Sequence, residues 1–316
     1  MPLSVLLALA LAAPSVRLAP PAARPGDAVL VTVLDAPGEP APQGTLAGRA
    51  LAFWRDGQGW RALAALPIET APGEAPLEVT AGGEVVRAAL LVVDPRFPSK
   101  TLRLPEKYVH PPKRVARRQA EDRAAFAAAY DRAFEPARFQ RFAYPREADR
   151  TGRFGDQRLV NGTQKSVHYG LDLDGAKGAP VAAAADGVVV LARDCYLSGN
   201  SIVLSHGAGA FTAYFHLSRM DVKVGDAVRL GDRIGLVGAT GRATGPHLHW
   251  SAKVSGLLVD PESLVFIDFA AGTAPPREPR APAAPPAPAA HAAPEGLEAT
   301  PPPPPPPTDG APAPPR

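Results

Sequence analysis

The sequence has few cysteines, little net charge and no long apolar segment. Cys195 is the only cysteine among 316 residues, so no disulfide can form within the chain, and we expect a packed thiol rather than a nucleophile. The formal net charge is +3. Residues 151–270 hold eleven Lys or Arg against eleven Asp or Glu, so they lack the basic face that nucleic-acid binding needs. We therefore expect no nucleic-acid partner.

No stretch of the sequence is long and apolar enough to span a bilayer as a helix, so we expect no stable membrane insertion. Residues 1–13, MPLSVLLALALAA, form a short apolar run that ends in small residues with an A-x-A pattern. This pattern is typical of a signal peptide, although the terminal amine is its only positive charge. A buried N-terminal strand or helix is the alternative. We predict an exported protein, periplasmic or secreted, without a lipid anchor because no cysteine follows the run.

Proline is unevenly distributed. The chain holds 39 prolines, and they crowd residues 271–316, which include the unbroken run 301–307. Few large apolar side chains occur there, so this segment cannot bury enough surface to offset the entropy lost on ordering. We predict a disordered, extended tail over residues 271–316 that is suited to act as a tether.

The part of the chain before the tail is predicted to be mainly β, with one helical connection. Short apolar runs broken by Gly, Pro and Asp indicate a small antiparallel β-sandwich over residues 20–100, with Trp54 and Trp60 in its core. Residues 111–150 are predicted to be a helical linker. Two prolines precede an amphipathic helical pattern over residues 113–134, which we expect to pack between two domains.

Residues 151–270 are predicted to form a compact, antiparallel all-β domain. Strand-like runs alternate with glycine-containing turns, and no helical periodicity is present. The predicted strands cover residues 188–192, 201–205, 212–215, 234–237 and 247–254.

Histidines gather in this last domain, where five of the chain's seven lie between residues 168 and 249. His168 is followed four residues later by Asp172, His216 stands in a Tyr-Phe-His-Leu sequence, and His247 and His249 flank one leucine. Residues two apart in a strand project to the same face, so His247 and His249 point the same way from one rigid element. His168 and Asp172 complete a metal site if their turn faces that strand.

Imidazole and carboxylate groups are typical zinc ligands, and a site with three protein ligands keeps its fourth position open to water, as catalytic sites do. A further histidine beside the metal can accept the proton of the attacking water or stabilise the oxyanion. The HExxH motif of helical zinc proteases is absent from the sequence, so no glutamate is placed for that role. Any one of these histidines taken alone is more often a hydrogen-bonded core residue.

The ordered motifs His-x-x-x-Asp, Tyr-x-His-Leu and Thr-Gly-x-x-Thr-Gly-Pro-His-Leu-His resemble those of the lysostaphin-type (LytM-like) zinc metalloendopeptidases. The resemblance covers roughly residues 154–264 and includes the preceding Phe-Gly-Asp-Gln-Arg at residues 154–158. The sandwich and helical linker also look like those of some family members. The resemblance implies an antiparallel β fold of the duplicated-hybrid-motif type, and peptide cross-links or stem peptides of peptidoglycan as substrate.

The resemblance also implies roles for individual residues. His168, Asp172 and His249 match the family's zinc ligands, and His216 and His247 match its two catalytic histidines. No metal or catalytic position departs from the family pattern.

The remaining histidines and one nearby carboxylate receive no catalytic role. Asp174 falls outside the motif and is expected to shape its turn. His206 looks structural or like a residue that supports a metal ligand from behind, and His110 and His291 lie outside the domain.

We predict a zinc metalloendopeptidase that hydrolyses peptide bonds in peptidoglycan. One alternative is a non-enzymatic module that binds peptidoglycan or activates another wall hydrolase, but the intact ligand set argues against it. Another is a phosphocarrier domain of related fold, which needs cytosolic partners and conflicts with a signal peptide. We expect bond selectivity to depend on loops at residues 148–167 and 193–200, and nothing in the sequence indicates an oligomeric state.

Overall fold

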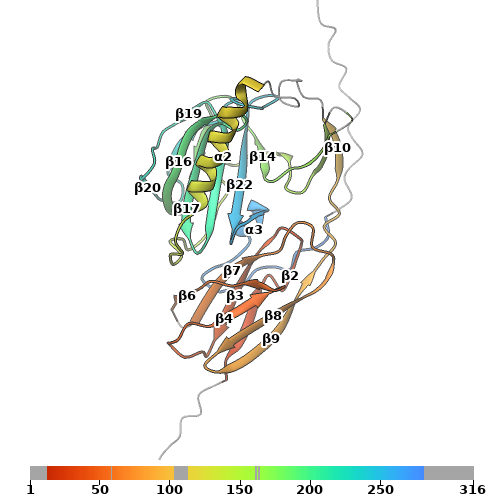
Figure 1. Cartoon of the computed structure of the whole chain (residues 1–316), viewed down its shortest axis with the longest axis vertical. Coiled ribbons are helices and arrows are strands. Elements are labelled where there is room, and N and C mark those ends of the chain that lie inside the picture. The colour runs from red at the N-terminus through yellow and green to blue at the C-terminus, as the bar shows by residue number, and fades with distance from the viewer. Residues whose placement is uncertain (1–12, 58, 103–112, 161, 163, 281–316) are drawn as a thin grey trace, which may run out of the picture. The chain divides into compact units, whose positions relative to one another are not determined.

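The computed structural model describes residues 13–280 apart from residues 58, 103–112, 161 and 163. The chain is mainly β, as predicted (Figure 1). Its N-terminal part contains two sheets. One has the strand order β1 (Ser15–Ala19), β3 (Ala28–Leu34), β7 (Gly59–Ala65), β6 (Phe53–Asp56). The other has the order β2 (Ala22–Ala23), β9 (Glu84–Val92), β8 (Gly73–Ala81), β4 (Gln43–Leu46), β5 (Arg49–Ala50).

The two N-terminal sheets share a hydrophobic core. In β8 buried and exposed residues alternate, as expected for a strand with one face on a core. Its Leu77 and Val79 belong to the same buried cluster as Val31 of β3. Strand β3 is buried on both faces, because Leu30 belongs to a second cluster that also contains residues of the C-terminal part.

Trp54 and Trp60 are both core residues, as predicted, since each is only 5% exposed. They serve different cores. Trp60 packs in the cluster shared by the N-terminal sheets, whereas Trp54 packs in the cluster shared with the C-terminal part.

The C-terminal part is built on an eight-stranded antiparallel sheet. Its order is β11 (Arg150–Gly152), β14 (Leu171–Asp174), β22 (His247–Val254), β18 (Ala210–Leu217), β17 (Gly199–Gly207), β16 (Gly187–Cys195), β20 (Ala227–Val228), with β23 (Leu257–Val259) paired to β22. A three-stranded sheet has the order β15 (Pro180–Ala182), β21 (Arg233–Leu236), β19 (Arg219–Met220). Another has the order β10 (Ser99–Leu102), β12 (Gln157–Val160), β13 (Gln164–Val167). The five predicted strands of this part correspond to β16, β17, β18, β21 and β22.

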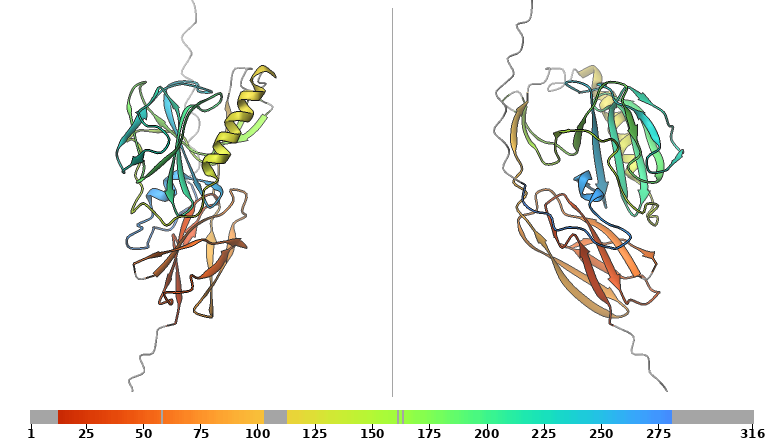
Figure 2. Two further views of the ribbon diagram at one scale, coloured as in Figure 1. Left: turned by 60° about the vertical axis from the view of Figure 1, so that its left-hand side comes forward. Right: turned by 180° about the vertical axis from the view of Figure 1, so that it is seen from behind.

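The predicted linker helix is present as η1 (Lys113–Val115) and α2 (Ala116–Tyr130), so it ends four residues earlier than predicted. It does not pack between two domains as we expected. It lies on one face of the eight-stranded sheet (Figure 2). There Phe126 meets Phe215 edge-on with ring centroids 5.7 Å apart, and Tyr130 meets Phe211 at 5.3 Å. Aromatic packing therefore fixes the helix to the sheet that carries the histidines.

The second half of the predicted linker, residues 131–149, contains no helix and contributes to the C-terminal core. The backbone N–H of Ala143 donates to the carbonyl of Ala184. Phe139 and Phe142 are buried and pack against Phe269. Residues 131–149 are therefore packed into the C-terminal core and do not form a free connector.

A short helix, α3 (Pro261–Val265), is present where we expected none. Asp260 caps it by accepting a hydrogen bond from the N–H of Glu262, and Pro261 occupies the first position. Asp followed by Pro is a recognised helix start signal. Five residues are too few to show the 3.6-residue periodicity from which helices are predicted.

Residues 271–280 differ from the disordered tail that we predicted from residue 271 onward. Arg277 Nε lies 3.2 Å from Asp27 Oδ2, and Arg277 Nη2 lies 3.3 Å from Asp260 Oδ2. Both carboxylates are buried, so the arginine compensates charges that would otherwise be costly to desolvate. Composition alone does not reveal such pairing. Residues 281–316 lie outside the described residues.

The predicted signal peptide also falls almost entirely outside the described residues, in residues 1–12. Within the described part of the chain, no helix has the length and apolar character needed to cross a membrane.

Candidate metal centre

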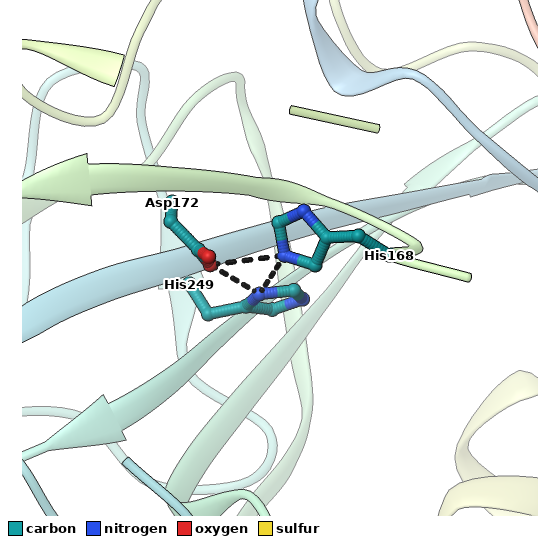
Figure 3. A group of neighbouring side chains, drawn as sticks. All are labelled: His168, Asp172 and His249. Atoms are coloured by element: carbon teal, nitrogen blue, oxygen red, sulfur yellow. Dashed lines mark hydrogen bonds and ion pairs between the residues drawn. The ribbon is translucent and has the colours of Figure 1, made fainter. Parts of the chain in front are cut away.

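Three side chains from distant parts of the sequence meet at one point (Figure 3). His168 Nε2 lies 3.0 Å from Asp172 Oδ1 and 3.0 Å from His249 Nδ1, and His249 Nδ1 lies 2.7 Å from Asp172 Oδ1. The potential ligand atoms all lie within 4.8 Å of one another. The structure thus brings together the three residues to which the family resemblance assigns metal binding.

Strand pairing explains why Asp172 and His249 converge. They are directly opposite residues in the antiparallel pair β14 and β22. His247 lies two residues before His249, opposite Asp174, and shares the face of His249 as its spacing predicts. Its Nε2 is 3.8 Å from Asp172 Oδ1. His168 precedes β14 and reaches the same point from the turn.

Hydrogen bonding determines which nitrogen of His168 is available. Its Nδ1 lies 2.9 Å from the carbonyl oxygen of Arg153, which can only accept, so Nδ1 carries a proton and, in the neutral ring, Nε2 presents a lone pair. Metal-binding histidines usually make such a bond through the other ring nitrogen. One carboxylate oxygen and two imidazole nitrogens therefore surround the shared point. This donor set fits a zinc-type cation.

Arg158 orients the Asp172 carboxylate. Its Nη2 lies 3.1 Å from Asp172 Oδ2, which leaves Oδ1 to face the two histidines. Burial by itself raises the pKa of the Asp172 carboxyl, but the hydrogen bonds and charges of His168 and His249 outweigh it and hold the pKa well below its usual range. Asp172 is therefore ionised at neutral pH, as a metal-binding carboxylate must be.

His216 reaches the centre because β18 is irregular at this residue. The register of β17 and β18 shifts between Asn200 and Ile202, and the φ angle of His216 is 62°, which non-glycine residues rarely adopt. Consecutive residues of a regular strand project to opposite faces. Here the rings of Phe215 and His216 both approach the His249 ring, at centroid distances of 5.4 and 6.2 Å. The irregularity therefore turns His216 toward the centre.

His216 and His247 form a second pair beside the convergent atoms, with ring centroids 5.0 Å apart. Nδ1 of His216 lies 2.8 Å from the carbonyl oxygen of Thr240, and Nδ1 of His247 lies 2.9 Å from that of Gly245. In the neutral rings these bonds leave Nε2 unprotonated. Burial, together with the charge of His249, lowers the pKa of His216 to about 4, so His216 is neutral at pH 7 and can accept a proton.

Two glycines make room for the convergent side chains. A Cβ at Gly170 would lie 2.5 Å from His249 Nε2, and a Cβ at Gly152 would lie 2.5 Å from Asp172 Oδ2. Neither glycine has a positive φ angle, so the requirement is for space rather than for backbone conformation.

Sequence reasoning missed the groups that orient the histidines. The carbonyl groups of Arg153, Thr240 and Gly245 act through the backbone, so no residue type marks them. The contact between Arg158 and Asp172 had one available signal. Arg158 belongs to the Phe-Gly-Asp-Gln-Arg segment that takes part in the family resemblance.

The histidines without a predicted role stay away from the centre or are not described. His206 is fully buried, with Nδ1 2.7 Å from the carbonyl oxygen of Asp186 and Nε2 2.8 Å from Thr212 Oγ1, as expected of a structural residue. Cys195 is buried too. His110 and His291 lie outside the described residues.

A pocket of about 560 Å³ opens over the convergent side chains. Both loops that we expected to govern bond selectivity contribute to its wall, with Arg158 and Ser166 from residues 148–167 and Leu197 and Ser198 from residues 193–200. The turn before β22 supplies residues 242–246. The pocket therefore combines the three convergent side chains, two further histidines and residues of three loops.

Comparison with known proteins identifies the family. The model of peptidase family M23 matches residues 166–261. A crystal structure of a Pseudomonas aeruginosa protein assigned to peptidase M23 is 30% identical, with a TM-score of 0.56, and the match covers 76% of this chain and 93% of that chain. This chain belongs to peptidase family M23. The residues that match the M23 model include the four histidines and one aspartate of the predicted site, His168, Asp172, His216, His247 and His249. The match confirms the predicted family resemblance.

Curated relatives match about a third of this chain. Peptidoglycan DD-endopeptidase ShyA from Vibrio cholerae is 42% identical over 119 residues, which are 37% of this chain and 28% of ShyA. DD-carboxypeptidase/endopeptidase Mpg from Neisseria meningitidis is 43% identical over 98 residues, which are 31% of this chain and 23% of Mpg. The M23 chain described here thus spans about a quarter of the length of these two relatives.

Proposed function

We propose that this chain is a zinc-dependent endopeptidase that hydrolyses peptide bonds in peptidoglycan. The observation that carries the proposal is the convergence of His168, Asp172 and His249 in a pocket that also presents His216 and His247. Peptidoglycan is proposed as the substrate because relatives such as ShyA and ShyC are named peptidoglycan DD-endopeptidases.

His168 would hold the ion through Nε2, Asp172 through Oδ1 and His249 through Nδ1. When bound, a zinc ion supplies a Lewis acid that lowers the pKa of water to about 7 and polarises a carbonyl group. The chain's own contribution is orientation. In the neutral ring of His168 the carbonyl of Arg153 holds the proton on Nδ1 and leaves Nε2 for the ion, and Arg158 keeps Asp172 Oδ1 turned toward the histidines.

His216 and His247 are proposed to carry protons. One of them accepts the proton of the attacking water at Nε2, and the other faces the oxyanion that develops on the substrate carbonyl. A low pKa keeps His216 neutral at pH 7, so its Nε2 is ready to accept. The carbonyls of Thr240 and Gly245 leave Nε2 of each neutral ring free to accept a proton, and the ring that faces the oxyanion would stabilise it in its protonated form, through an Nε2–H bond.

A zymogram containing purified peptidoglycan tests the proposal. Wild-type protein is expected to produce a clearing band, a chelator to abolish it, and added zinc to restore it. His168→Ala and His249→Ala are expected to lose both bound zinc and the band. Undiminished clearing by these variants would overturn the proposal. Folded, zinc-loaded wild-type protein that binds peptidoglycan without clearing it would indicate the non-enzymatic module.

We also propose that the protein is exported, because peptidoglycan lies outside the cytoplasm, and that residues 1–13 direct the export. Protein recovered from the periplasm or medium is expected to begin after this segment on N-terminal sequencing. Retention of the uncleaved chain in the cytoplasm would contradict the proposed location.

A further inference from the structure

The helix α2, which precedes the peptidase domain in sequence, carries a buried carboxylate. Asp122 is only 6% exposed. Its Oδ1 accepts a hydrogen bond from Arg193 Nε at 2.9 Å, and its Oδ2 accepts one from the backbone N–H of Tyr196 at 2.8 Å. One partner lies near the end of β16 and the other directly follows that strand. Asp122 therefore ties the helix at two points to the connection between β16 and β17.

The helix is also held by contacts that do not involve Asp122. Phe126 and Tyr130 meet two phenylalanines of β18 edge-on, with ring centroids 5.7 and 5.3 Å apart. Asp122 precedes Phe126 by four residues, so both side chains lie on the face of the helix that meets the sheet. The carboxylate is thus presented to the connection from an element that aromatic packing fixes in place.

The connection between β16 and β17 is a loop of three residues, 196–198, and two of them line the pocket over the metal centre. The carbonyl oxygen of Ser198 accepts a hydrogen bond from the backbone N–H of His216 at 2.8 Å. Just after the loop, the N–H of Asn200 donates to Thr240 Oγ1 at 3.0 Å, and Thr240 is the residue whose carbonyl orients the His216 ring. The loop therefore supports both the backbone and the ring of His216.

His216 needs this support because of its backbone conformation. Its φ angle of 62° lies in the left-handed region, which non-glycine residues rarely adopt. A residue keeps such a conformation only where the surrounding contacts hold it there. If the loop is released, we expect the backbone of His216 to relax toward the ordinary strand conformation, in which consecutive side chains project to opposite faces. Its ring would then leave the pocket.

We propose that Asp122 is a positioning residue, which holds the loop at residues 196–198 and thereby keeps His216 turned toward the metal centre. This inference rests on the proposed peptidase function, in which His216 carries a proton. Asp122 lies outside residues 166–261, which match the family model, so the support comes from the segment that precedes them. The proposed zinc ligands lie on β14, on the turn before it and on β22, not on the strands that this loop connects. Loss of Asp122 should therefore lower turnover and leave zinc binding unchanged.

Substitutions of Asp122 in the zinc-loaded full chain test the proposal, with soluble peptidoglycan fragments as substrate. Asp122→Ala removes both hydrogen bonds and should lower kcat about 10- to 100-fold, as expected when a catalytic group is displaced by about 1 Å. Zinc affinity, measured by competition with a chromogenic chelator, should keep its wild-type value. Asp122→Asn retains an acceptor oxygen for the N–H of Tyr196, so it should recover part of the lost kcat. Wild-type kcat in Asp122→Ala, or loss of its zinc, would overturn the positioning role.

Arg118→Gln is the matched control. Arg118 lies on the same helix and pairs with Asp194 of β16 at 2.8 Å, but the two side chains are 45% and 64% exposed. Because exposed ion pairs contribute little, both kcat and zinc affinity should stay at their wild-type values. A loss of kcat as large as that of Asp122→Ala would mean that any weakened contact of the helix suffices, which would overturn the role assigned to Asp122.

Amide hydrogen exchange of the zinc-loaded proteins gives a second readout, which requires no activity. The N–H of His216 should exchange at least about tenfold faster in Asp122→Ala than in wild type or Arg118→Gln, because the loop that accepts its hydrogen bond opens more often. If exchange is faster but wild-type protein cleaves no peptidoglycan, the peptidase proposal fails and the positioning role stands. If wild-type protein is active but Asp122→Ala changes neither exchange nor kcat, only the positioning role fails. Unchanged exchange in an inactive protein would overturn both.

Discussion

Gly170 lies against the imidazole ring of His249, so closely that a Cβ at Gly170 would be 2.5 Å from His249 Nε2. We predict that Gly170→Ala displaces the ring, and with it the Nδ1 atom that faces His168 and Asp172. Zinc affinity should fall at least about tenfold, as it does when groups that orient a ligand are changed. Competition with a chromogenic chelator measures this.

Gly38→Ala provides the control for this prediction, since a Cβ there meets no atom closer than 3.5 Å and Gly38 has no positive φ angle. It should leave zinc affinity unchanged. Wild-type affinity in Gly170→Ala would show that the ring is not held in the orientation that the hydrogen bonds indicate.

Substitutions of His216 and His247 should affect turnover, whereas substitutions of His168 and His249 should affect metal binding. We predict that His216→Ala and His247→Ala retain close to stoichiometric zinc and lose about 10²- to 10⁴-fold in kcat, because they remove proton transfer or oxyanion stabilisation. His249→Ala should lose zinc itself. Metal analysis and single-turnover kinetics on the same samples distinguish these outcomes. Loss of zinc from His247→Ala would instead make His247 a ligand.

His206 should make stability depend on pH. Burial lowers the pKa of His206 from 6.5 to about 4. Between these pH values the imidazole is protonated in the unfolded state but not in the folded state. Folding stability is therefore lost as the pH falls from about 6.5 toward 4. By pH 4.5 the loss from this residue alone should be about 2–3 kcal/mol.

Urea unfolding of metal-free protein at pH 7 and pH 4.5 measures this effect. His206→Gln should be less stable than wild type at pH 7, because it loses the bonds to Asp186 and Thr212. It should nevertheless lose less stability than wild type on acidification. Equal losses in the two proteins would mean that His206 does not resist protonation in the folded state.

Arg277 should stabilise the fold through the carboxylates of Asp27 and Asp260, which are 1% and 2% exposed. Arg277→Met removes their shared partner and leaves buried negative charge with less compensation. We predict a loss of about 3 kcal/mol in the free energy of unfolding. Arg229→Met, on the exposed surface, should change it by less than about 0.5 kcal/mol. A similar small effect for Arg277→Met would exclude a stabilising role for the ion pairs.

The sequence is most informative where chemistry and strand register coincide. The two-residue spacing of His247 and His249 predicts their common face, because the spacing is a property of any strand. The meeting of Asp172 with His249 could not be derived in this way, because it depends on the pairing of β14 with β22, whose residues lie far apart in the chain. Only the family resemblance predicted that Asp172 and His249 belong to the same metal site.

Other features of the site depend on interactions that leave no local pattern. The turn of His216 toward the centre requires a register shift in β18, and its ring is oriented by a backbone carbonyl. Arg277 and Arg280 stand in a stretch whose composition predicts disorder, yet long-range ion pairs hold them. In both cases the deciding partner is distant in sequence, so residue type and periodicity are insufficient.

Strand β3 has consequences for how this protein can evolve. One of its faces packs within the sandwich, and the other shares a core with the peptidase part, where Ala28 N–H also donates to Ser263 Oγ. A recombination event that replaced the sandwich would have to supply a matching apolar face and a substitute for Asp27 at the same time. We therefore expect the two halves to be inherited together, and peptidase segments released by proteolysis to aggregate through the uncovered face.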